Sequence, residues 1–295
     1  MDVPAFLHEQ LLVQYGAQAA QIEQGFLGPR RTSLRVNRLR AMREEVERDL
    51  REAGIAFEGV DWFEDALLLA PGQEDAVRQT PLYPSGKVYL QSLSSMLPPL
   101  LLGALPGENI LDMAAAPGGK TTQIASMTQG RAMITACERH APRLERMRAN
   151  LERQGATRVS LMQQDARQLS DLFSFDRVLL DAPCSGSGTL LPGSHGRFED
   201  ALLRKTASLQ RALLTKALRL VKPGGIVVYS TCSILRQENE EVVASALDGG
   251  DCELVPVDEA RFAQVPRLPT TLSGTMLVSP TPRYEGFFAA ALRRR

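Results

Sequence analysis

The sequence predicts an α/β protein in which a small α+β domain precedes a doubly wound parallel sheet. Short apolar strands alternate with helical stretches over residues 109–229, and this alternation is typical of right-handed β-α-β units. Two of these strands end unusually. Residues 177–188, RVLLDAPCSGSG, lead from an apolar run into an acid, a proline, a cysteine and a Gly/Ser loop. Residues 225–233, GIVVYSTCS, end in a second cysteine, so a functional site is expected where the strands end.

The sheet domain is expected to occupy residues 79–295. Its strands are predicted at 109–114, 132–138, 159–165, 177–181 and 225–229. The intervening helices are predicted at 119–127, 141–154 and 201–221. The final segment, EGFFAAALRRR, is expected to add an edge strand with a basic tail.

The small α+β domain is expected at residues 1–78. Apolar side chains at three- and four-residue spacing predict a helix over 1–24. A strand at 32–37, a helix at 42–53 and two short strands up to residue 71 then form an RRM-like β-α-β-β unit. Such a unit serves either as an RNA platform or as simple packing, and the fold alone does not decide.

Bulk composition is that of an ordinary globular protein, 44% hydrophobic and 23% charged. No apolar run approaches about 18 residues, and the N-terminus does not resemble a signal peptide, so a cytoplasmic protein without membrane contact is expected. The four cysteines form no CxxC pair and no Cys/His cluster, which argues against a metal site. Cys137 and Cys252 are expected to be buried filler. We expect a monomer.

The net charge is zero, with 34 basic and 34 acidic residues, and does not by itself favour nucleic acid as a partner. The distribution is more informative, because residues 25–43 contain six arginines and no acid. Arg35, Arg38 and the arginine-rich block 139–158 are candidate RNA phosphate contacts. A genome rich in G and C would also produce many arginines.

The first strand of the sheet leads into residues 111–121, LDMAAAPGGKT. Small side chains there let a ligand lie against the backbone, and the following helix N-terminus suits a carboxylate or a phosphate. The Walker A loop, GxxxxGK[ST], shares the Gly119-Lys120-Thr121 end of this motif. Ala114 stands where that loop requires glycine, and Pro117 removes one amide donor, so a nucleotide triphosphatase is disfavoured.

Three successive strands are predicted to end at acids, namely Glu138, Asp165 and Asp181. Any one of them alone would be a solvent-facing acid at a strand end. Together around a glycine-rich turn they favour a nucleoside pocket, with Glu138 on the ribose hydroxyls and Asp165 on an adenine amino group. Adenosine carrying an amino-acid tail fits, because the helix end can hold the carboxylate.

Six motifs in order resemble the RsmB/Nop/Sun family of S-adenosylmethionine-dependent RNA (cytosine-5) methyltransferases. They are LDMAAAPGGKT, CERHAPRLERMRANLERQGA, QQDAR, LDAPCSGSGTL, LVKPGGIVVYSTCSILRQENEEVV and GFFAAALR. The resemblance covers residues 89–295 and is weaker in the segment SLRVNRLR. Its double signature, Pro-Cys and Thr-Cys-Ser, is highly specific. The family usually has a cysteine where this sequence has Ala114. The resemblance implies that this residue lines the cofactor pocket and takes no part in the chemistry.

The resemblance implies a Rossmann-like class I methyltransferase sheet and S-adenosyl-L-methionine as cofactor. The implied cofactor residues are Ala114, Ala115, Ala116, Pro117, Gly118, Gly119, Lys120, Glu138, Asp165 and Asp181. The implied product is 5-methylcytosine in RNA, formed on a base that leaves its stack. Ribosomal RNA is favoured and transfer RNA stays open, as does a catalytically silent RNA-binding factor on the same fold.

The chemistry requires a thiolate to attack cytosine C6, so that C5 can accept a methyl group. The Pro-Cys motif also resembles DNA cytosine-5 methyltransferases, which would make Cys184 the nucleophile. The RNA family implies the reverse: Cys232 attacks and Cys184 assists release. Protonation or hydrogen bonding at N3, with contacts to the 4-amino group, would draw charge into the ring, and Asp181 is placed for this. Lys120 can face either the cofactor carboxylate or Asp181, and a lysine there would lower the pKa of Asp181, which complicates a role as an acid.

Overall fold

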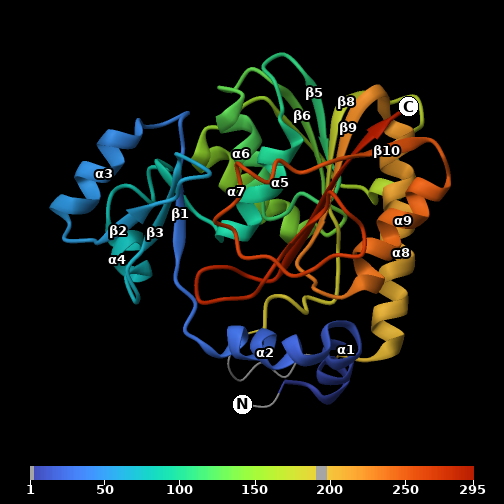
Figure 1. Cartoon of the computed structure of the whole chain (residues 1–295). Coiled ribbons are helices and arrows are strands. Elements are labelled where there is room, and N and C mark those ends of the chain that lie inside the picture. The colour runs from blue at the N-terminus through green and yellow to red at the C-terminus, as the bar shows by residue number, and fades with distance from the viewer. Residues whose placement is uncertain (1–2, 191–197) are drawn as a thin grey trace.

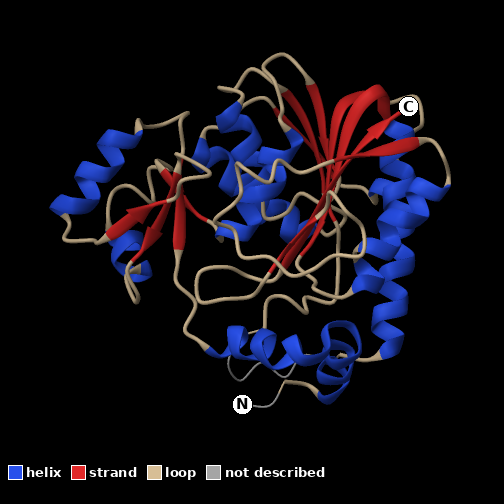
Figure 2. Ribbon diagram, in the orientation of Figure 1, coloured by secondary structure: helices blue, strands red, loops and turns tan. Residues whose placement is uncertain are grey.

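The larger part of the molecule is an eight-stranded sheet, and a four-stranded sheet lies beside it (Figures 1 and 2). These counts refer to residues 3–190 and 198–295, which the computed structural model describes. The larger sheet has the order β10-β12-β9-β8-β5-β6-β7, with β11 paired to β12. Its strands are β5 (Asn109–Asp112), β6 (Met133–Cys137), β7 (Val159–Met162), β8 (Phe175–Asp181), β9 (Val221–Thr231), β10 (Cys252–Val255), β11 (Met276–Val278) and β12 (Phe287–Arg294).

Strands β5 to β9 pair in parallel, which confirms the doubly wound sheet. From β5 the chain moves one way through β6 and β7, and then the other way through β8 and β9. The order therefore reverses between β5 and β8, and ligands of open α/β sheets bind at that point, beyond the carboxyl ends of the strands. Both cysteine-bearing tips lie at this edge, because β8 and β9 are neighbours.

Alternate side chains of each central strand pack on opposite faces. Val178 and Leu180 join the core shared with α8 (Asp200–Leu220) and α9 (Glu240–Asp248). Leu179 joins the core shared with α6 (Gly119–Met127) and α7 (Ala141–Gln154). This period of two lets helices cover both faces of the sheet, as Figure 1 shows.

The predicted helix over residues 1–24 is interrupted. The structure has α1 (Ala5–Tyr15), a short 3₁₀ turn (Gly16–Gln18) and α2 (Ala19–Leu27). Gly16 adopts a φ of 54°, a left-handed conformation that a helix cannot continue through. The apolar faces of both helices join the core of the larger sheet rather than that of the small one, with Leu11 and Ile22 fully buried there.

The small sheet has the antiparallel order β2-β3-β1-β4. Its elements are β1 (Ser33–Val36), α3 (Arg43–Glu52), β2 (Phe57–Gly59), β3 (Ala66–Leu69), α4 (Glu74–Gln79) and β4 (Val88–Leu90). The predicted β-α-β-β unit is present, and β4, beyond residue 78, completes its sheet. The division of the chain at residue 78 stays a prediction.

The last strand is not at the sheet edge, contrary to expectation. β12 lies between β9 and β10, antiparallel to both. Its residues from Phe287 to Leu292 are all buried, which is typical of a strand covered on both faces. Helix α5 (Leu93–Leu102) was also missed, because Pro98 and Pro99 lie inside it. Within the described ranges, no helix is long and apolar enough to cross a membrane.

Candidate active site

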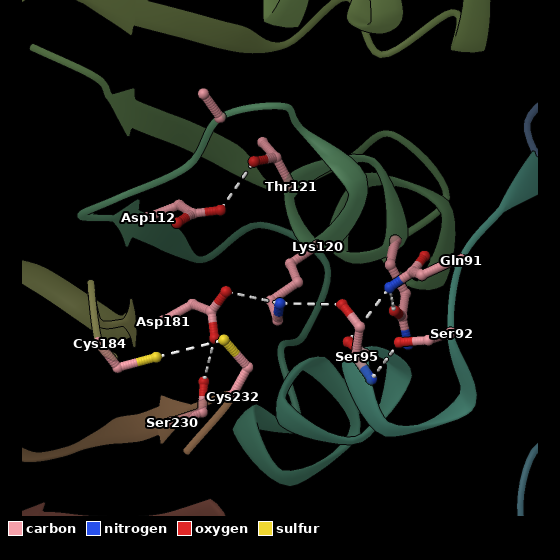
Figure 3. A network of polar contacts seen from close by, with 12 residues as sticks. Gln91, Ser92, Ser95, Asp112, Lys120, Thr121, Asp181, Cys184, Ser230 and Cys232 are labelled. Carbon is pink, nitrogen blue, oxygen red and sulfur yellow. Dashed lines mark hydrogen bonds and ion pairs between the residues drawn. The ribbon is translucent and has the colours of Figure 1, made fainter. Parts of the chain in front are cut away.

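The tips of β8 and β9 bring the two predicted thiols together. The strands stay in register to their ends, with Asp181 opposite Ser230. The backbone remains tied past that point, because the Gly188 amide donates to the Cys232 carbonyl at 3.0 Å. As a result Cys184 Sγ and Cys232 Sγ lie 3.2 Å apart, as free and partly accessible thiols (Figure 3). The predicted proximity of the two cysteines is therefore present.

Asp181 is held by donors from two other elements. Lys120 Nζ, from the first turn of α6, lies 2.6 Å from its Oδ2, and Ser230 Oγ donates to its Oδ1 at 2.8 Å (Figure 3). The same Lys120 ammonium donates to Ser95 Oγ at 2.9 Å and lies 5.5 Å from the centre of the Phe287 ring. Of the two partners predicted for Lys120, the structure therefore shows Asp181.

The Lys120 ammonium remains charged despite its burial. Burial alone would lower the pKa of Lys120, but the charge and hydrogen bond of Asp181, with smaller effects of Asp112 and Cys232, raise it above its ordinary value. Figure 3 shows Lys120 and Asp181 on the Cys232 side of the pair of sulfur atoms.

Cys184 is in the opposite electrostatic situation. The hydrogen bond to Cys232, burial and the nearby charge of Glu238 raise the pKa of the Cys184 thiol well above its ordinary value. Cys184 therefore carries its proton, and either sulfur can be the donor in the contact between the two thiols. Cys137 and Cys252 are buried, and burial raises the pKa of Cys137 to about 12, as suits an unreactive side chain.

A cavity of about 220 Å³ opens beside the thiols. Four of the predicted cofactor residues line it, namely Ala114, Glu138, Asp165 and Asp181, together with both cysteines. The other predicted cofactor residues, 115–120, are not among those that line the cavity and lead from Ala114 into α6. Gly118 there has a φ of 100°, and a Cβ on it would lie 3.2 Å from Met147 Cγ, so the turn requires glycine. The cofactor role of all these residues stays a prediction.

The two acids expected to bind the nucleoside already have partners within the chain. Glu138 accepts from the His140 amide at 2.8 Å and lies 3.2 Å from Arg143 Nη1. Asp165 forms a two-pronged ion pair with Arg167, and the Arg167 guanidinium is the first cause lowering the pKa of Asp165. Asp165 also lies beyond its strand, because β7 ends at Met162. Both carboxylates are thereby fixed in orientation at the cavity.

Asp112, at the end of β5, is fully buried beneath the glycine turn. Its Oδ2 accepts from Thr121 at 2.7 Å, whereas its Oδ1 has no hydrogen-bond partner among the residues described. Burial raises the pKa of Asp112 to about 6. A buried acceptor without a donor favours a cationic ligand group close by, such as the ammonium of an amino-acid tail.

Comparison with known proteins identifies the family of the chain and supports its fold. The family model described as 16S rRNA methyltransferase RsmB/F matches residues 99–293, and the ferredoxin-like domain of RsmF/B-like proteins matches residues 3–74. The chain belongs to the RsmB/F methyltransferase family. A crystal structure of a methyltransferase homologue from Pyrococcus horikoshii, 32% identical, matches with a TM-score of 0.86 over 100% of both chains. The predicted Rossmann-like methyltransferase fold and small α+β domain are thus confirmed.

Two curated members of the family illustrate the range of named relatives. Ribosomal RNA small subunit methyltransferase F of Shewanella loihica is 39% identical over 82% of this chain and 49% of its own length. The 28S rRNA (cytosine-C(5))-methyltransferase of mouse is 36% identical over 90% of this chain and 35% of its own length. The chain thus spans about half or less of the length of these two relatives.

The prediction that Arg35 contacts RNA phosphates is wrong. Arg35 is 1% exposed, and its guanidinium donates to Gln91 Oε1 at 3.0 Å and Thr122 Oγ1 at 2.9 Å. A buried guanidinium cannot reach a phosphate. Arg38 lies 3.2 Å from Glu64 and pairs with Asp65, so acids of this chain already engage it. In the block 139–158 the exposed arginines Arg139, Arg143, Arg146, Arg148 and Arg158 keep the prediction open.

Three residues of the site were missed in the sequence. Ser95 follows the N-terminal cap of α5, where Ser92 Oγ accepts from the Ser95 amide. Ser230 stands in the YSTCS motif but lacks a chemical signature of its own. Glu238 lies six residues after Cys232 in the family motif, and only the folded chain shows that its carboxylate contacts the Cys184 loop.

Proposed function

We propose that this chain is an S-adenosylmethionine-dependent RNA (cytosine-5) methyltransferase that forms a covalent bond between Cys232 and the target base. The observation that carries the proposal is the 3.2 Å contact between Cys184 Sγ and Cys232 Sγ at the tips of adjacent strands. One catalytic thiol needs no second thiol against it. A reaction that both makes and breaks a carbon–sulfur bond gives each thiol a separate task.

The proposed first step is the attack of the Cys232 thiolate on cytosine C6. A C6–S bond forms, and the C5–C6 π electrons move into the ring, which makes C5 nucleophilic. After C5 has gained a methyl group, its proton leaves to a solvent base. The C5–H electrons form the C5–C6 double bond as the C6–S bond breaks with its electron pair on Cys232. The Cys184 S–H, which faces that sulfur, stabilises the thiolate as it leaves.

Asp181 is proposed to orient the base. Because Lys120 and Ser230 both donate to it, Asp181 acts as a hydrogen-bond acceptor, which suits the 4-amino group of cytosine rather than proton donation to N3. The target nucleotide must leave its stack to reach this position.

S-adenosylmethionine fits the residues around the cavity, and when bound it supplies the electrophilic methyl group. Asp112 offers an unpaired acceptor to an ammonium group, and the N-terminus of α6 offers amide donors to a carboxylate. Glu138 is proposed to hold the ribose hydroxyls and Asp165 the adenine amino group, both from the cavity wall.

Ribosomal RNA is the proposed substrate, because the relatives reported above are named as methyltransferases of small-subunit and 28S rRNA. Bisulfite sequencing of RNA from cells with and without the gene tests this. We expect one ribosomal cytosine to lose its methylation in the deletion strain. Loss of methylation confined to transfer RNA would identify transfer RNA as the substrate. No loss at all would favour the catalytically silent RNA-binding factor.

A simpler experiment tests the cofactor. S-adenosylmethionine is expected to raise the melting temperature of the purified chain, because a ligand that binds only the native state stabilises it. ATP is expected to have no effect, since the Walker A requirement fails at Ala114. A melting temperature raised by ATP and unchanged by S-adenosylmethionine would favour a nucleotide triphosphatase instead.

A further inference from the structure

A buried glutamate lies behind Cys184 and has no place in the reaction described above. Glu238, in the 3₁₀ turn Arg236–Glu238, is 0% exposed. Its Oε1 accepts from the Ser185 amide at 2.8 Å, and its Oε2 accepts from Ser185 Oγ at 2.6 Å. Gln210 Nε2, from α8, approaches Oε1 at 3.3 Å. All three donors are uncharged, so the carboxylate is held by hydrogen bonds and not by a cation.

These hydrogen bonds bracket Cys184 on both sides. Ser185, directly after Cys184, is gripped at its amide and its hydroxyl, and Gln210 Nε2 also donates to the carbonyl of Pro183, directly before it, at 3.0 Å. Glu238 itself is fixed to the neighbouring strand, because Tyr229 OH of β9 donates to its carbonyl at 2.5 Å. One glutamate thus joins the loop of one thiol to the strand that leads to the other.

The charges around the pair of thiols are unequal. The Lys120 ammonium lies on the Cys232 side (Figure 3), and the Glu238 carboxylate lies on the Cys184 side, where it is bonded to Ser185. A buried anion beside a thiol favours the neutral form of that thiol. Glu238 is one of the groups that raise the pKa of Cys184, after the hydrogen bond to Cys232 and burial.

We infer that Glu238 is a positioning residue for the release step. Glu238 holds the Cys184 loop so that a neutral Cys184 thiol faces the Cys232 sulfur. The inference rests on the proposed covalent mechanism. In the release step the C6–S electron pair returns to Cys232, and the C5 proton goes to a solvent base. Glu238 exchanges no proton in it. Its effect is to keep the Cys184 S–H where the departing sulfur needs a donor.

Glu238→Gln tests this role, because it keeps the size of the side chain and one acceptor oxygen while it removes the charge. Unmodified ribosomal RNA transcribed in vitro and S-adenosylmethionine serve as substrates. We expect the rate of the first methyl transfer in a single turnover to stay within about twofold of wild type. Steady-state turnover is expected to fall about ten- to hundredfold, with a protein–RNA adduct accumulating on denaturing gels.

Glu240→Gln is the matched control. Glu240 is 3% exposed and two residues away, and neither of its carboxylate oxygens has a hydrogen-bond partner among the described residues. It should release RNA as wild type does. A merely structural role for Glu238 would slow adduct formation and release together, and that result would overturn the inference, as would wild-type release in Glu238→Gln.

Ser185→Ala keeps the inference testable if Glu238→Gln does not fold. It removes one of the donors to Glu238 and leaves the carboxylate in place, so we expect the same accumulation to a smaller extent, and normal release would count against the inference. Cys184→Ala separates the two proposals. If that variant traps no adduct, the division of roles proposed for Cys232 and Cys184 fails. If it traps an adduct and Glu238→Gln releases normally, only the role of Glu238 fails.

Discussion

The tips of β8 and β9 present the same functional group in two different surroundings. Cys232 follows β9 on the side of a buried ammonium, which is paired to Asp181 at 2.6 Å. Cys184 follows β8 in a loop that a buried carboxylate holds by hydrogen bonds of 2.6 and 2.8 Å. Two thiols 3.2 Å apart are thereby made chemically unequal. In the proposed mechanism, the residues behind each thiol, rather than the thiol itself, assign attack to Cys232 and release to Cys184.

The largest expected effect comes from the tip of β9. Cys232→Ala should lower methyl transfer by on the order of 10³-fold or more, because it removes the attacking atom. Transfer of labelled methyl groups to RNA measures this. Cys252→Ala, at a buried thiol away from the cavity, is the control and should keep its activity. Substantial activity in Cys232→Ala would show that Cys232 is not the attacking thiol.

The tip of β8 should respond in a different manner. Cys184→Ala is expected to reduce turnover while a covalent protein–RNA adduct that survives denaturant accumulates, since the bond forms but breaks slowly. The adduct is quantified on denaturing gels with and without ribonuclease. If Cys184→Ala abolishes adduct formation and Cys232→Ala accumulates the adduct, the two assignments must be exchanged.

The ammonium on the Cys232 side can be removed without touching either thiol. Lys120→Met leaves Asp181 without its ion-pair partner, and we expect turnover to fall about 100-fold, because a preorganised charge next to the reacting groups is lost. Lys216→Met breaks an ion pair with the exposed Asp171, and neither residue lines the cavity. It should leave turnover unchanged. Equal losses in both variants would show that the effect of Lys120 is not local.

The smallest effect concerns Asp112, below the cofactor turn. Its pKa of about 6 exceeds the value of about 3.9 in an unfolded chain, so the native state binds the proton more tightly. Its contribution to stability is full below about pH 4 and is lost as the pH rises to 6. The free energy of unfolding of Asp112→Asn, relative to that of wild type, should therefore rise by about 2–3 kcal/mol between pH 4 and pH 7. Urea unfolding at several pH values measures the difference, and a difference independent of pH would contradict it.

Much of the fold follows from local pattern. The strands of the parallel sheet and the helices α6, α7 and α8 follow apolar periodicity, which local sequence carries directly. The position of β12 does not, because a strand order depends on pairings between distant residues. The break at Gly16 was missed for another reason, since the apolar spacing continues through it while the backbone reverses hand.

The sequence predicts those parts of the site whose chemistry belongs to single residues. Cys184, Cys232 and Asp181 stand at strand tips that the sequence marks with acids, cysteines and glycines. The charge of an arginine does not reveal its burial, so Arg35 was taken for a surface residue. Glu238 is 53 residues from its partner Ser185, and a contact over that separation exists only in the folded chain.

RNA with 5-fluorocytosine at the target position tests directly, in the unmodified enzyme, whether Cys232 makes the bond to the base. Fluorine at C5 replaces the proton that must leave, so the adduct of the wild-type protein cannot break down. Digestion and mass spectrometry then identify the cysteine that carries the nucleotide. We predict that the nucleotide and its added methyl group are found on Cys232, with Cys184 as a free thiol. A nucleotide on Cys184 would contradict the account.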